Sequence, residues 1–372
     1  MNSKVTPFSS VKGYFVTTDD LANAMKNDDK VFLYSRGSDP TVDQFNNAMA
    51  DLENKDAAVS FASGAGAISA VLLSLLKSGD HVIYNQRSYS WARHLMKNHL
   101  KRFGVDCTEV PDTDFGNVAK YIRPNTKLIY VETPTYFFFE DLNLKTLFST
   151  AKKQNIITVL DNTYFGPNNL KPDYQNFDVV LHSTTKMICG DGKALGGVAC
   201  TNHDLRKKIF IDGLMSLGSV MSSVVASKML EGLSSYNERA ERVSSEMKPL
   251  INFLQTDSRV KKVHYPWTLN KTNEWSEHEH AKFPVGLLSI QLATENSVVV
   301  KSFCESLRLV KMAVSYGSKE ALIMPSLIFA HKTDLHFPMN MCRISIGEQS
   351  GAAVAADIKQ SLDKAFGNSP GH

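Results

Sequence analysis

The chain has 372 residues, 43% of them hydrophobic, and its 41 basic and 38 acidic residues leave a net charge of only +3. That balance gives no reason to expect a nucleic-acid or acidic-membrane partner, and the length suits a large domain with a smaller second one. Five irregularly spaced cysteines without a CxxC argue against a disulfide framework or a zinc site. Because no signal-peptide core or membrane-spanning apolar run is found, we expect a cytoplasmic protein.

In chain order, residues 1–35 show no strong periodicity and predict an N-terminal arm. Strand and helix patterns then alternate up to residue 235, which predicts a large α/β domain over 36–235 with a mainly parallel sheet covered on both faces. The expected strands are 57–62, 81–84, 127–132, 156–161, 179–182 and 197–201. The expected helices begin near residue 41 and cover 65–76, 90–103 and 143–154.

The pattern changes after residue 235, where a long amphipathic helix is expected near 236–255. Strands follow at 261–265, 287–292 and 343–346, with helices near 296–308 and 350–366. This mixture predicts a smaller C-terminal α+β domain over 236–372.

Three groups of residues at predicted strand ends are suited to binding an anion or forming a covalent bond. Residues 63–66, SGAG, lie between a strand and a helix, where small residues and free N–H groups can receive a phosphate. Asp161 ends one strand, and residues 183–186, STTK, follow another. Each group alone is equally compatible with a turn, a cap or a surface loop. Ligands of open α/β sheets bind at the carboxyl ends of the strands, so we expect the three groups to meet there.

Together these groups match the needs of pyridoxal phosphate (PLP): a lysine for an imine, an acid for the pyridine nitrogen and a cup for the phosphate. Further motifs are YSRGSDPT (34–41), ETPT (132–135), DNT (161–163), AVSYG (313–317) and RISIG (343–347). As a set, from about residue 5 to 366, they resemble the Cys/Met-metabolism PLP-dependent enzymes, which include cystathionine lyases and synthases and methionine γ-lyase. The resemblance implies an α/β PLP fold of type I, like that of aspartate aminotransferase.

The resemblance also implies catalytic and substrate-binding roles at matching positions. Lys186 would carry PLP as a Schiff base and move the substrate α-proton, while Asp161 would pair with the ring nitrogen. Tyr89 would stack on the cofactor ring and assist proton transfer to the leaving sulfur. Arg343 would bind the substrate carboxylate, with Ser315 beside it.

For the cofactor phosphate, the resemblance implies a set of four residues of the same subunit: Gly64, Ala65, Ser183 and Thr185. Tyr34 and Arg36 would reach the phosphate from a neighbouring subunit. We therefore expect a homo-oligomer with a shared active site, most typically a homotetramer built as a dimer of dimers. The other expected partner is a small amino-acid substrate.

Three positions depart from the family pattern or bear on the substrate. Tyr136 replaces the asparagine that bonds the phenolic oxygen of the cofactor, and Trp91 replaces a small residue after the stacking tyrosine. These changes suggest the hypothesis of a narrowed, aromatic-lined substrate pocket. Val314 stands where relatives acting on cystathionine at the γ position often have glutamate, and its apolar side chain suits an apolar substrate end.

The function we expect is a PLP-dependent carbon–sulfur lyase of cysteine and methionine metabolism. It would act on a sulfur-containing amino acid by β- or γ-elimination, giving a thiol, ammonia and a 2-oxo acid. The alternative is a γ-replacement transferase of the cystathionine γ-synthase or sulfhydrylase type, and a regulatory homologue that has kept the fold is a further one. A more remote alternative is a serine acyltransferase, because residues 183–186 also match SxxK.

A metal site could be imagined at residues 277–280, EHEH, but a solvated loop explains this segment better, and we expect no metal.

Overall fold

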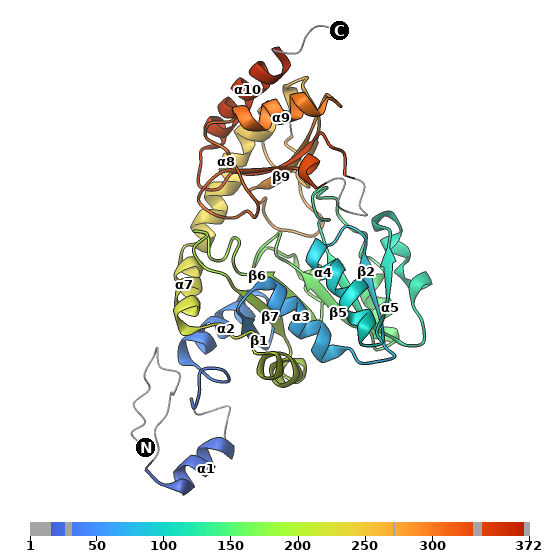
Figure 1. Cartoon of the computed structure of the whole chain (residues 1–372), viewed down its shortest axis with the longest axis vertical. Helices are drawn as coiled ribbons and strands as arrows, with labels where there is room; N and C mark the ends of the chain where they lie inside the picture. Colours follow the sequence, from blue (N-terminus) through green and yellow to red (C-terminus); the bar gives the residue numbers. More distant parts are fainter. Residues whose placement is uncertain (1–15, 27–31, 271, 330–336, 368–372) are drawn as a thin grey trace.

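The computed structural model describes residues 16–26, 32–270, 272–329 and 337–367, so much of the expected arm lies outside the described residues. Two sheets form the body of the protein, a larger one in the middle of Figure 1 and a smaller one above it. Helix α1 (Thr18–Lys26) stands apart below the larger sheet. Within the described part, we find no helix with the length and apolar character needed to cross a membrane.

The larger sheet has seven strands in the order β1-β7-β6-β5-β4-β2-β3. All neighbouring pairs are parallel except that β7 runs antiparallel to both β1 and β6, which confirms the expected mainly parallel sheet. The strands are β1 (Ala57–Phe61), β2 (His81–Asn85), β3 (Asp106–Val110), β4 (Thr126–Glu132), β5 (Ile157–Asp161), β6 (Val179–Ser183) and β7 (Gly197–Thr201). Edge strand β3 was not predicted, because only its last residue is buried.

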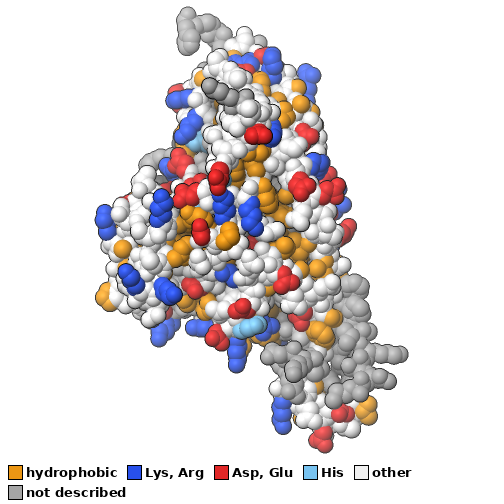
Figure 2. Space-filling view, turned by 180° about the vertical axis from the view of Figure 1, so that it is seen from behind, with side chains coloured by type: hydrophobic (Ala, Val, Ile, Leu, Met, Phe, Trp, Pro, Cys, Tyr) orange, Lys and Arg blue, Asp and Glu red, His pale blue; other side chains and the backbone are white. Residues whose placement is uncertain are grey.

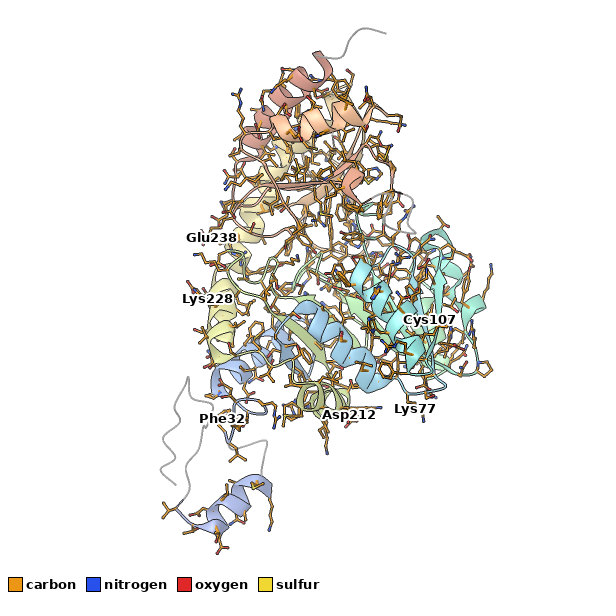
Figure 3. The ribbon with its side chains drawn as sticks, in the orientation of Figure 1. Phe32, Lys77, Cys107, Asp212, Lys228 and Glu238 are labelled. Carbon is orange, nitrogen blue, oxygen red and sulfur yellow. The ribbon has the colours of Figure 1, made fainter. Side chains whose placement is uncertain are left out.

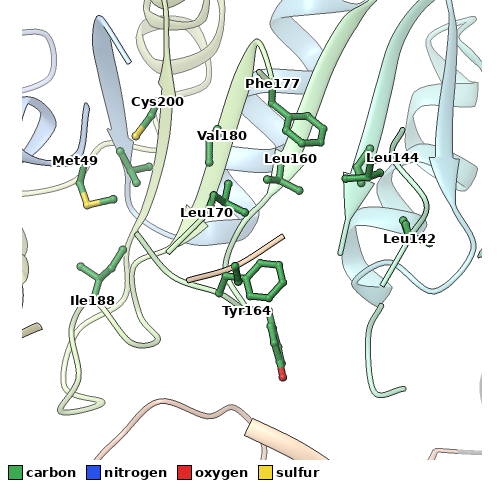
Figure 4. Packing of buried hydrophobic residues seen from close by; sticks show 14 of the residues in the cluster. Met49, Leu142, Leu144, Leu160, Tyr164, Leu170, Phe177, Val180, Ile188 and Cys200 are labelled. Carbon is green, nitrogen blue, oxygen red and sulfur yellow. The ribbon is translucent and has the colours of Figure 1, made fainter. Parts of the chain in front are cut away.

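Helical segments cover both faces of this sheet, because successive residues of a strand point to opposite sides. On β6, Val180 packs into the same core cluster as Leu160 of β5 (Figure 4), whereas Val179 and Leu181 pack into the cluster on the other face. The α-helices are α2 (Pro40–Leu52), α3 (Gly64–Leu75), α4 (Ser90–His94), α5 (Leu147–Lys153), α6 (His203–Lys208) and α7 (Ser223–Ser234). The π- and 3-10 segments are η1 (Leu95–Leu100), η2 (Asp112–Tyr121), η3 (Pro172–Tyr174) and η4 (Ile209–Met215).

One predicted helix starts late and another changes its hydrogen-bonding pattern. The helix expected over 143–154 begins only at Leu147, because the Asn143 side chain accepts a hydrogen bond from the N–H of Lys145 at 3.2 Å and favours a turn there. The helix expected over 90–103 is α-helical for one turn and then continues as the π-helix η1.

The smaller sheet has five strands in the order β10-β11-β12-β9-β8, with a core of its own. Its strands are β8 (Val260–His264), β9 (Leu287–Leu292), β10 (Lys311–Met312), β11 (Leu322–Pro325) and β12 (Met341–Ser345). Its helical segments are α8 (Tyr236–Thr256), α9 (Ser297–Ser306), η5 (Ser326–Ile328) and α10 (Gly351–Gly367). Since α8 begins at residue 236, we retain the division at residue 235 as a proposal.

Candidate active site

The candidate site lies where the carboxyl ends of β4, β5 and β6 face the smaller sheet. Asp161 ends β5 and Ser183 ends β6, so the turn that carries Lys186 follows directly. The Nζ of Lys186 donates a hydrogen bond of 2.5 Å to Oγ of Ser315. This bond joins the larger sheet to a segment that precedes Arg343 of β12. Residues 129 positions apart in the sequence therefore meet in one site.

The Asp161 carboxylate is held from two neighbouring positions. Its Oδ2 accepts a hydrogen bond of 3.0 Å from the Tyr130 hydroxyl. Its Oδ1 accepts bonds of 3.1 Å from the N–H and 2.5 Å from the hydroxyl of Thr163. Asp161 is buried, so these donors fix the orientation of its carboxylate at the strand end. Neither Tyr130 nor Thr163 was singled out from the sequence.

Lys186 has an unusually acidic ammonium group. Burial lowers its pKa to about 8, and the positive charge of Arg343 lowers it further, against the opposing effect of Asp161. The Nζ also lies 4.6 Å from the centre of the Tyr316 ring. A substantial fraction of the amine is therefore neutral near neutral pH, which is the form that attacks a carbonyl carbon.

We expect the capture of PLP by the cofactor-free protein to follow the neutral form of Lys186. Because the pKa is lowered, the rate should rise with a midpoint near pH 8 rather than near the usual value of about 10.4. Stopped-flow absorbance of the lysine-linked cofactor against pH measures this. Arg343→Met should move the midpoint to higher pH, because it removes a neighbouring positive charge. A wild-type midpoint near that of an ordinary lysine would contradict the expectation.

The phosphate-binding candidates gather at the N-terminus of α3. Ser63 caps this helix by accepting a bond of 3.0 Å from the N–H of Gly66, and the first N–H groups, those of Gly64 and Ala65, have no partner within the helix. Gly64 lies so close to Ser183 that an added Cβ would come within 2.7 Å of the serine Cβ. Thr185 exchanges hydrogen bonds of 3.1 and 3.3 Å with the backbone of Gly196.

These donors fit the cofactor. Free N–H groups at a helix start and two hydroxyls suit a phosphate, a fixed carboxylate suits the ring nitrogen, and the acidic ammonium of Lys186 suits imine formation.

Arg343 is a buried cation with aromatic neighbours. Its Nη2 donates to the carbonyl oxygen of Ser315 at 2.8 Å, and its guanidinium carbon lies 6.0, 5.7 and 5.4 Å from the ring centres of Tyr136, Phe137 and Tyr316. Within the described ranges, no acidic side chain forms an ion pair with it. A buried guanidinium without an anion is a suitable partner for a substrate carboxylate.

Two further tyrosines extend this aromatic surface. The rings of Tyr89 and Tyr136 meet edge to face at 6.4 Å between centres. Burial raises the pKa of the Tyr89 phenol, and the nearby Tyr136 and Asp161 raise it further, so the hydroxyl keeps its proton at neutral pH. The backbone N–H of Tyr89 donates to Glu132, which sequence reasoning missed. Its place at the end of β4, like that of Asp161 on β5, was the available signal.

Four predicted site residues are not brought into this group. Trp91 and Val314 are 63% and 71% exposed, and Trp91 packs edge to face on His94. Tyr34 is half-exposed, and Arg36 stacks over its ring at 5.9 Å. Figure 3 shows Phe32, two residues before Tyr34, on the side of the larger sheet that is away from the smaller one.

The segment at residues 277–280 is an irregular loop, but the expectation that it is solvated was wrong for its histidines. His278 and His280 are buried, and their ring nitrogens lie 2.8 and 3.4 Å from the Asp141 carboxylate. The Nδ1 of His278 also accepts bonds from two backbone N–H groups of the loop. The pair thus anchors the loop to the larger domain, and no group of potential metal ligands is found among the described residues.

An α/β fold of this topology, with an acidic lysine, a fixed aspartate and a phosphate cup at the strand ends, defines a PLP-dependent enzyme of fold type I. The family model described as "Cys/Met metabolism PLP-dependent enzyme" matches residues 1–363. The chain belongs to this family, as its motifs indicated, and PLP is its cofactor.

Individual relatives are similar over nearly their whole length. The chain is 30% identical to an L-methionine gamma-lyase of Fusobacterium nucleatum subsp. polymorphum, over 90% of this chain and 86% of that protein. It is also 30% identical to a cystathionine gamma-lyase of Bacillus subtilis, over 89% of each. A cystathionine beta-lyase of Lactococcus lactis subsp. cremoris is 30% identical, over 90% of this chain and 89% of that protein.

Two solved structures support the fold. That of metB from Corynebacterium glutamicum has a TM-score of 0.84 at 27% identity, over 95% of this chain and 91% of that one. A putative O-acetylhomoserine (thiol)-lyase, metY, from Campylobacter jejuni has a TM-score of 0.85 at 25% identity, over 97% and 96%. The second structure contains N'-pyridoxyl-lysine-5'-monophosphate, so it carries its pyridoxyl group on a lysine.

Proposed function

We propose that the protein is a PLP-dependent carbon–sulfur lyase that acts on a sulfur-containing amino acid by β- or γ-elimination. The observation that carries the proposal is the group formed by Lys186, Asp161 and Arg343, which supplies a base, a ring-nitrogen partner and a carboxylate receptor. Relatives named methionine gamma-lyase and cystathionine beta- and gamma-lyase support the same reaction class.

In this proposal each residue has one task. Bound PLP supplies an electron sink for the bond that breaks at the substrate α-carbon. Arg343 binds the substrate carboxylate with its free guanidinium nitrogens and so orients the α-hydrogen. Lys186 takes that proton at Nζ, which a pKa of about 8 suits. Tyr89 keeps its hydroxyl proton and offers it to the departing sulfur.

The proton that is removed next decides the branch. A thiol on the β-carbon leaves directly, whereas a thiol on the γ-carbon leaves after a proton is removed from the β-carbon. Both branches end in a thiol, ammonia and a 2-oxo acid.

The second candidate is γ-replacement, in which an incoming thiol takes the place of the leaving group. It is favoured by the likeness to the putative O-acetylhomoserine (thiol)-lyase, whose fold matches over nearly the whole chain. The SxxK acyltransferase alternative has no such support. In the described part of the chain, Lys186 bonds to Ser315, and no bond between Lys186 and Ser183 is found.

The first experiment is to incubate the purified protein with cystathionine and to identify the 2-oxo acid by mass spectrometry. We expect pyruvate from β-elimination or 2-oxobutyrate from γ-elimination. Methionine and O-acetylhomoserine with a thiol are run in parallel. Product only from O-acetylhomoserine would overturn the lyase proposal in favour of replacement, and a protein inactive on all three would contradict both.

We also propose that the working form is a cytoplasmic homo-oligomer, with Tyr34 and Arg36 contributing to a neighbouring subunit's phosphate site. In support, both side chains lie outside the Lys186 group of their own chain, and Arg36 is exposed. Large apolar side chains such as Leu217 and Val224 are exposed as well, and Figure 2 shows apolar side chains gathered across the middle of the back face. Sedimentation equilibrium tests the assembly.

Tyr136 gives a prediction about substrate choice. Its ring lies between Tyr89 and Arg343, so Tyr136→Asn should widen the pocket and raise kcat/KM for bulkier thioether amino acids relative to methionine, by roughly tenfold. Tyr136→Phe keeps the ring and should leave the ranking of substrates in place. Trp91→Gly is the comparison at an exposed position. Competition between substrates measures the ratio, and an unchanged ranking in Tyr136→Asn would contradict the narrowed pocket.

A further inference from the structure

Glu132 lies beside Asp161 on the floor of the site. The two residues end the parallel strands β4 and β5 and are register partners, so their side chains leave the sheet on the same face. Asp161 is held by three hydrogen bonds and is the partner proposed for the cofactor ring nitrogen. Two acidic side chains side by side in a partly buried place need a reason, because like charges there repel strongly.

Glu132 is fixed from one neighbour and itself holds another. The side-chain amide of Asn85, the last residue of β2, accepts the N–H of Glu132 at 2.9 Å and donates to its carbonyl oxygen at 3.2 Å. Oδ1 of Asn85 also accepts the Ser88 hydroxyl at 2.7 Å. The Oε2 of Glu132 then accepts the backbone N–H of Tyr89 at 2.5 Å. This chain of contacts ends on the residue that is proposed to meet the cofactor ring.

We propose that Glu132 is a positioning residue, whose carboxyl group holds the backbone of Tyr89 and thereby sets the place of the Tyr89 ring. The inference rests on the proposed function, which gives Tyr89 its task. Tyr89 has no other such anchor at the start of α4, since its own side chain makes no capping bond to that helix. Glu132 therefore acts on the reaction through Tyr89 and does not itself touch the substrate.

The charge state of Glu132 follows from its surroundings. Burial raises its pKa well above the usual range, the neighbouring Asp161 raises it further, and the N–H of Tyr89 opposes both. Asp112 of η2 adds a smaller effect in the raising direction. The other ionisable side chains that face it are the phenols of Tyr130, Tyr136 and Tyr316 and that of Tyr89 itself.

The carboxyl group is thus protonated near neutral pH, which leaves Asp161 as the only anion of the pair. Its carbonyl oxygen still accepts the Tyr89 N–H. At higher pH, ionisation of Glu132 would place a second negative charge beside Asp161, so activity should decline on the alkaline side.

Two variants of the holoenzyme separate this role from a general structural one. Glu132→Gln keeps an uncharged acceptor, and kcat/KM at neutral pH should fall by less than about fivefold, with the alkaline decline moved to higher pH or lost. Glu132→Ala removes the acceptor, and kcat/KM should fall on the order of 10²-fold because the Tyr89 ring is misplaced. The circular dichroism of the bound cofactor should change in Glu132→Ala and resemble the wild type in Glu132→Gln. Glu140→Gln, an exposed acid nearby, is the matched control.

A readout without turnover keeps the test independent of the proposed reaction. In the cofactor-free protein, the infrared band of a protonated carboxyl group should be weaker in Glu132→Gln than in the wild type, and thermal unfolding checks that all variants fold. Equal impairment of the Gln and Ala variants would overturn the inference, as would an unchanged cofactor signal in a folded Glu132→Ala. If no thioether is cleaved at all, the proposed function fails while the dichroism and infrared results still decide the role of Glu132.

Discussion

Lys186→Ala is expected to reduce kcat by at least about 10⁴-fold, to the limit of detection. The substitution removes both the covalent attachment of PLP and the base at the substrate α-carbon, and general acid–base catalysis alone contributes 10²–10⁴-fold. The variant should also lose the absorbance of the lysine-linked cofactor, while added PLP is still held by the phosphate cup near Gly64 and Ser183. Steady-state kinetics, absorbance spectra and equilibrium dialysis against PLP measure the three effects.

Lys193→Ala is the matched control for this experiment. Lys193 lies in the same connecting segment, its side chain is largely exposed, and it forms only an ion pair of 3.7 Å with Asp191. Exposed pairs of this kind contribute at most about 1 kcal/mol, so activity and absorbance should stay as in the wild type. Retention of more than a few per cent of activity by Lys186→Ala, or an unchanged spectrum, would refute its assignment as the cofactor lysine.

The central part of the site could be predicted because local rules determine it. Asp161 and the turn that carries Lys186 follow buried strands, and the carboxyl ends of parallel strands meet at one edge of a sheet. The same rule applies to Glu132, which the analysis of the sequence overlooked because its motif was compared only with the family pattern. Residue type and position along a strand were thus sufficient for this half of the site.

The other half depends on how the smaller sheet sits against the larger one, which no local pattern contains. The contact of Lys186 with Ser315 and the aromatic surroundings of Arg343 join residues that are more than a hundred positions apart. The exposure of Trp91 follows from the direction of a single turn of α4, which spacing alone does not give. Burial of His278 likewise needs its distant partner Asp141. Long-range packing, and not residue chemistry, limited the prediction.

Arg343→Met is expected to lower kcat/KM by roughly 10²–10³-fold, mainly by raising KM. Truncating one partner of a buried, hydrogen-bonded charge pair costs about 2–5 kcal/mol, and the proposed partner here is the substrate carboxylate. In the free enzyme that carboxylate is absent, and Arg343 is buried among aromatic rings without a recorded counter-ion in the described residues. Removing the charge should therefore leave the free energy of unfolding similar or slightly higher, since an uncompensated buried charge is itself costly.

A substrate lacking the carboxylate tests this account directly. The decarboxylated analogue of the preferred amino acid should be a poor ligand of the wild type, and Arg343→Met should bind it no worse than the wild type does. Arg259→Met is the opposite control, because Arg259 is paired with Asp257 and Asp363 at 2.6 Å in the smaller domain. It should lower the thermal midpoint while KM stays the same. If Arg343→Met weakened the binding of substrate and analogue equally, Arg343 would be acting on the shape of the site and not on the carboxylate.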